Sequence, residues 1–145
     1  EQQEAEYLAT SFKISVERLA ARGQSLGVLL LHRRCASCWG ALIQEPEQGI
    51  NIEAKKHLRQ IAEHCSKTPD FIHPGLPVLE AVFRILLSGR NRPMTLEAIH
   101  QLLQERWTEI TNPRTPQPAT LHRILTHDTF YGISQVSEMQ QENSS

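Results

Sequence analysis

The chain has 145 residues, of which 39% are hydrophobic and 21% charged, and its formal net charge is −1. These values are typical of a globular protein and exclude a largely disordered chain. The longest apolar run, 28–31, is far shorter than the roughly 20 residues that a membrane span requires, so we expect no membrane partner. Because the net charge is close to zero, any affinity for nucleic acid would have to come from a local basic surface.

The first half of the chain predicts three amphipathic helices, over 7–22, 25–43 and 51–66. Apolar residues recur in each at intervals of three or four positions, which places them on one helix face. A loop around Pro46 separates the second helix from the third. Prolines 69, 74 and 77 then mark a junction, so we expect residues 1–72 to form an N-terminal helical part.

The second half predicts a different order of elements. An apolar helix over 78–88 is followed by a short extended piece at 92–94, and Thr95 is placed to cap a further helix. A turn over 112–118 contains three prolines and leads into a short helix over 115–127. Strand-forming residues follow over 130–136, and residues 138–145 are a polar tail.

This order of elements resembles the winged-helix branch of the helix–turn–helix superfamily over about residues 76–137. The resemblance rests on the order itself and on the framing segments Arg92-Pro93-Met94-Thr95 and Asp128-Thr129-Phe130-Tyr131-Gly132-Ile133. It implies a winged-helix-like module over 73–137. We therefore predict a mainly α fold in which the N-terminal helical part packs on this module. One departure is that only a single strand-forming segment follows the last helix, whereas a wing is a hairpin.

The resemblance also implies that the helix over 115–127 lies in a major groove of DNA. Helical spacing turns Leu121, Ile124 and Leu125 inward and leaves the opposite face exposed. The nucleic-acid-binding residues that it implies are the polar residues of this exposed face and nearby arginines: Arg90, Arg92, Arg114, Thr120, His122, Arg123 and His127.

A second candidate site lies in the N-terminal half, where Cys35 and Cys38 form a C-x-x-C pair and His64 precedes Cys65. Three thiolates and one imidazole make a complete tetrahedral zinc site. Three cysteines with a fourth ligand can also hold an iron–sulfur cluster. The sequence thus predicts a metal site of Cys35, Cys38, His64 and Cys65, with zinc or an iron–sulfur cluster as the cofactor.

Two other interpretations of the cysteines stay open. All three fall on apolar helix seams, where unpaired cysteine acts as a small hydrophobic core residue and no cofactor is needed. Alternatively, Arg33 and Arg34 lower the pKa of a neighbouring thiol and make a redox-active pair.

The sequence contains no phosphate-binding loop, nucleophile elbow or paired-carboxylate motif, so we do not expect an enzyme. An odd number of cysteines without scaffold-like spacing favours a reducing, cytoplasmic compartment. The leading hypothesis is a regulatory protein that binds DNA or a transcription-related protein, with a cysteine-based metal or redox sensor and a homodimer as further expectations. The alternative is a metal-free protein–protein interaction adaptor built on the winged-helix-like module.

Overall fold

A computed structural model of the protein describes residues 2–35, 38, 54–68, 71–73, 75–107 and 115–136. Arg114, the loop around Pro46, the end of the helix expected over 25–43 and the tail over 138–145 lie outside these residues. In chain order the elements are α1 (Gln2–Ala9), β1 (Ser11–Ile14), α2 (Val16–Ala21), α3 (Leu26–Leu31), α6 (Ala54–Glu63), the 3-10 helix η1 (Cys65–Lys67), α7 (Val78–Ser88), β2 (Met94–Thr95), α8 (Leu96–Arg106), α9 (Pro118–Thr126) and β3 (Ile133–Val136).

The strands form a three-stranded antiparallel sheet in the order β2-β1-β3. The prediction of a mainly α fold with a helical N-terminal part is therefore corrected: helices predominate among the described residues, but the architecture is mixed α/β. The central strand comes from the N-terminal half, with Ser11 opposite both Thr95 and Val136. The sheet thus joins segments from both halves of the chain.

The strand β1 replaces the middle of the helix predicted over 7–22. Phe12 and Ile14, two positions apart on one face of the strand, are fully buried, and Lys13 between them is half-buried. Leu8, Phe12 and Val16 also fit a helical spacing, which is why the sequence favours the wrong element. The strand prevails because β2 and β3 supply hydrogen-bonding partners on both sides, and Val16 is left 50% exposed.

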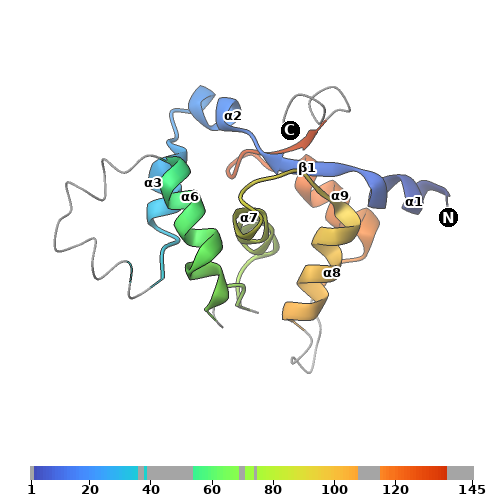
Figure 1. Ribbon diagram of the computed structural model, residues 1–145. Coiled ribbons are helices and arrows are strands. Elements are labelled where there is room, and N and C mark those ends of the chain that lie inside the picture. The colour runs from blue at the N-terminus through green and yellow to red at the C-terminus, as the bar shows by residue number, and fades with distance from the viewer. Residues whose placement is uncertain are drawn as a thin grey trace.

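Helix α7 lies at the centre of the molecule (Figure 1), with α3 and α6 on one side and α8 on the other. Its bounds agree with the helix predicted over 78–88, and Val82, Phe83 and Leu86 are fully buried. The predicted cap of α8 is also confirmed, because the Thr95 hydroxyl accepts a hydrogen bond from the N–H of Ala98 at 3.2 Å. Within the described residues, no helix is long and apolar enough to cross a membrane.

Helix α9 begins three residues after the predicted start at Thr115. Pro118 occupies the first turn, where its missing N–H costs nothing, and Gln117 precedes it in an extended conformation. Leu121 and Leu125 are fully buried and Arg123 is exposed, as the helical spacing predicts, whereas Ile124 and His122 are both half-buried.

Asn91 extends the sheet with its side chain. Its Oδ1 accepts the N–H of Ile14 at 2.7 Å, and its Nδ2 donates to the carbonyl of Ile14 at 2.9 Å. This side chain therefore takes the place of a strand residue beside β1. Asn91 and its neighbour Arg90 both have positive φ, 59° and 60°.

Replacing Asn91 by glycine should lower the free energy of unfolding by about 1–2 kcal/mol, because two part-buried backbone groups of Ile14 lose their partner. Glycine tolerates the positive φ, so the change isolates the side chain. The matched control is Arg90→Gly, which removes only an exposed ion pair with Glu63 and should change stability by less than about 0.5 kcal/mol. Urea denaturation measures both; equal effects would contradict this role of Asn91.

Candidate metal centre

Four side chains that can bind a metal ion lie together at the carboxyl ends of α3 and α6. One ligand atom from each of Cys35, Cys38, His64 and Cys65 lies within 4.8 Å of every other. Cys65 is fully buried, Cys35 and Cys38 are half-buried and His64 is exposed. The group is open to solvent on one side, so an ion can enter it.

The ends of the two helices position these residues. Helix α3 ends at Leu31, and backbone hydrogen bonds from Arg33 to Leu30 and from Arg34 to Leu31 form a turn before Cys35. Cys35 is therefore outside the helix that was predicted to contain it. In the second segment, α6 ends at Glu63, so that His64 and Cys65 begin the following 3-10 turn.

Three ligand-atom distances in the group are close to those around a single tetrahedral ion, and all the pairs lie within 4.8 Å. Zinc–sulfur bonds of about 2.3 Å and zinc–nitrogen bonds of about 2.0 Å place two sulfurs about 3.8 Å apart and a sulfur and nitrogen about 3.5 Å apart. The sulfurs of Cys38 and Cys65 are 3.8 Å apart. Nδ1 of His64 lies 3.3 Å from the sulfur of Cys35 and 3.5 Å from that of Cys38.

The sulfur distance also argues against a disulfide. A disulfide needs about 2.05 Å between sulfurs, whereas the sulfurs of Cys38 and Cys65 are 3.8 Å apart. The four residues could therefore hold a metal ion such as zinc.

Charged and polar neighbours surround Cys65. Burial raises the pKa of its thiol, although the N–H of Cys35, which donates to this sulfur at 3.2 Å, and the Arg34 side chain both act to lower it. Arg34 also contacts the buried His57, with 2.8 Å between Nη1 and Nδ1. In the absence of a cation, burial therefore favours the protonated form of this thiol.

Arg34 leaves one polar atom without a partner, since its Nε is buried and makes no hydrogen bond. Three thiolates around one divalent ion carry a net negative charge. A buried N–H beside them can donate to a thiolate sulfur and stabilise that charge, so this atom fits a metal-bound centre. Arg33 does not share this role: its guanidinium turns to Glu80 on α7. The sequence places Arg33 and Arg34 equally close to Cys35, and no motif shows that only Arg34 lies beside the thiols. No sequence signal places His57 near the site either.

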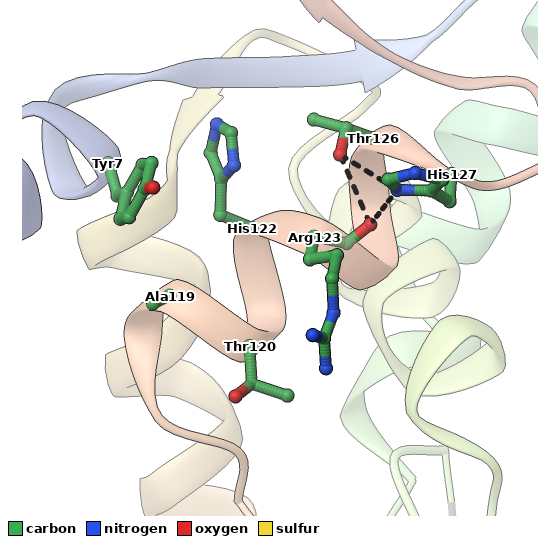
Figure 2. A pocket seen from close by; sticks show the side chains of 7 residues that line it. All are labelled: Tyr7, Ala119, Thr120, His122, Arg123, Thr126 and His127. Carbon is green, nitrogen blue, oxygen red and sulfur yellow. Dashed lines mark hydrogen bonds between the residues drawn. The ribbon is translucent and has the colours of Figure 1, made fainter.

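The predicted nucleic-acid-binding residues are brought together only in part. Thr120, His122, Arg123 and His127 line one open pocket of about 390 Å³ (Figure 2). Arg90 instead contacts α6 through its ion pair with Glu63 at 2.8 Å. Arg92 is exposed, and Arg114 lies outside the described residues.

Tyr7 of α1 completes this pocket, which we call the α9 pocket; it is lined by Tyr7, Ala119, Thr120, His122, Arg123, Thr126 and His127. The ring of Tyr7 stacks on His122, with 4.4 Å between centroids. Burial lowers the pKa of His122 and so favours the neutral imidazole. None of the described residues that line the pocket is acidic.

Neither a protein-family model, a curated protein nor a solved structure matches this chain. The assignment of function therefore depends on the two sites described above.

Proposed function

We propose that the protein binds one zinc ion through Cys35, Cys38, His64 and Cys65, and that the ion joins the ends of α3 and α6. The observation that carries this proposal is the mutual approach of the four ligand atoms within 4.8 Å. The ligands come from two segments about thirty residues apart in the chain. An ion shared between them therefore acts as a cross-link, as in structural zinc sites with four protein ligands.

Elemental analysis of protein purified without oxygen tests this proposal, with about one zinc per chain as the expected result. Cobalt added to the metal-free protein should give the visible bands of tetrahedral cobalt and intense sulfur-to-cobalt absorption. The variant His64→Ala should keep the sulfur bands and shift the tetrahedral ones. Colourless protein without bound metal would contradict the proposal. Brown protein that contains iron would also contradict it and would indicate an iron–sulfur cluster in place of zinc.

We also propose that the α9 pocket and the outer face of α9 contact the phosphates of a nucleic acid, which would make the protein a regulatory one. Three observations support this. The Arg123 side chain is exposed and, within the described residues, its guanidinium has no hydrogen bond or ion pair. Thr120 lies one turn before it, and its hydroxyl is a second phosphate donor. The absence of acids among the lining residues removes local repulsion.

Replacing Arg123 by alanine should weaken binding to double-stranded DNA about tenfold at low salt and reduce the salt dependence by about one phosphate contact. The matched control is Arg59→Ala, an exposed arginine on α6, which should bind as the wild type does. Fluorescence anisotropy at several salt concentrations measures both. If neither the salt concentration nor the Arg123→Ala change alters the measured affinity, the proposal is contradicted. The protein–protein interaction adaptor would then remain as the alternative.

A further inference from the structure

The turn that carries Cys35 is tied to the interior by Arg33. Its Nη2 and Nε donate to the two carboxylate oxygens of Glu80 at 2.7 and 3.1 Å, and its Nη1 donates to the carbonyl of Leu29 at 3.0 Å. The side chains of Arg33 and Glu80 are only 12% and 11% exposed. Such a two-pronged, partly buried pair has a fixed geometry, unlike a surface ion pair.

Glu80 in turn contacts the segment that follows α9. Its Oε1 accepts a hydrogen bond from the hydroxyl of Tyr131 at 3.0 Å. The ring of Phe83 lies between the same partners, with the guanidinium of Arg33 5.1 Å from its centroid and the ring of Tyr131 also 5.1 Å away. Burial and the neighbouring carboxylate raise the pKa of Tyr131 to about 12, so the hydroxyl remains a donor at neutral pH.

Tyr131 belongs to a turn that connects α9 to β3. The buried carboxylate of Asp128 accepts the backbone N–H groups of Phe130, Tyr131 and Ile133 at 2.9–3.1 Å. Three donors on one carboxylate make this turn a rigid unit. A contact at Tyr131 therefore acts on the whole segment, including the end of α9 and the edge strand β3.

We propose that occupancy of the metal centre controls the order of residues 128–136 through Arg33, Glu80 and Tyr131. This inference rests on the zinc site proposed above. Only one residue separates Arg33 from Cys35, so an ion that fixes Cys35 also fixes the backbone from which Arg33 reaches Glu80. When the ion leaves, that backbone is released, the Arg33–Glu80 geometry loosens, and Glu80 no longer holds the Tyr131 hydroxyl in one position. The metal centre thereby regulates the segment next to the α9 pocket.

Amide hydrogen exchange of the full chain, with zinc and with excess chelator, tests the proposal. On removal of zinc, exchange should become at least about fivefold faster in the ligand segment 54–68 and also in 128–136. Fivefold is about the smallest effect that is typical of two coupled sites. Helix α8 carries none of these contacts, so exchange in 96–106 should change little and serves as the internal reference.

The variant Tyr131→Phe removes the relay and keeps the ring. It should retain the zinc response of 54–68 and lose that of 128–136. Tyr7→Phe, the change at the other of the two tyrosines in the chain, should respond as the wild type does. A wild-type response confined to 54–68, or a response of 128–136 that survives in Tyr131→Phe, would overturn the relay and leave the zinc site intact. Protein that binds no zinc refutes the proposed site and the relay together.

Discussion

Removal of zinc is expected to lower the free energy of unfolding by about 4 kcal/mol when free zinc is about a thousandfold above its dissociation constant. The effect is large because the ion binds only when both ligand segments are in place, so its binding free energy is added to that of folding. Thermal or urea unfolding followed by circular dichroism, with zinc and with chelator, measures the difference.

The variant Cys65→Ser separates the contribution of the ion from that of the core. Cys65 is fully buried in the hydrophobic core, so the substitution also costs packing. The chelator-treated wild type gives the reference for this cost. In the variant the stability should be the same with zinc and with chelator, whereas the wild type should respond to zinc. An equal zinc response in both proteins would contradict the assignment of Cys65 as a ligand.

The second large effect is expected for Glu80→Gln, which should lower the free energy of unfolding by about 2–3 kcal/mol. Glu80 pairs with Arg33 and with Arg84, the latter at 2.9 Å, and it also accepts the hydroxyl of Tyr131. The amide cannot accept on both sides, so two largely buried guanidinium groups are left without a counter-charge. Chemical denaturation at neutral pH, with zinc present throughout, measures the loss.

A matched control for this substitution is Glu63→Gln. Glu63 also pairs with an arginine, Arg90, but the two side chains are 54% and 45% exposed, so the change should cost less than about 0.5 kcal/mol. If the two variants lost comparable amounts of unfolding free energy, the buried ion pairs of Glu80 would contribute no more than the exposed pair of Glu63. That result would contradict the stabilising role of Glu80.

The same carboxylate gives a pH dependence of known sign. Burial acts to raise the pKa of Glu80, but the hydrogen bonds and charges of Arg33 and Arg84 outweigh it and hold the pKa below 4.5. A lowered pKa in the folded state stabilises the protein at pH values above 4.5, and this contribution is lost as the pH falls through the folded value. The wild type should therefore lose more stability than Glu80→Gln on acidification from pH 5.

The ligands of the metal centre are predictable from the sequence because their chemistry is carried by residue type. A C-x-x-C pair and a His-Cys pair supply the donor set wherever the chain places them, and the structure brings all four together. The helices over 78–88 and from Thr95 are predictable for a similar reason, since the apolar spacing and the cap are local signals.

Non-local features are not predictable in this way. The strand β1 is four residues long and fits a helical spacing as well, so only its pairing with β2 and β3 decides its structure. The Arg33–Glu80–Tyr131 contacts join residues that are 47 and 51 positions apart, and no motif marks them. Tyr7 reaches the α9 pocket only because α1 packs on α9, which the predicted helix over 7–22 does not imply.

The place of β1 in the middle of the sheet has a consequence for biosynthesis. Ser11 pairs with Val136, which is synthesised 125 residues later. Until then β1 has one exposed edge and cannot complete its hydrogen bonds. The helices around α7 form from nearby segments and can assemble earlier, since contacts that are close in sequence form fastest. We therefore expect closure of the sheet to follow the packing of these helices.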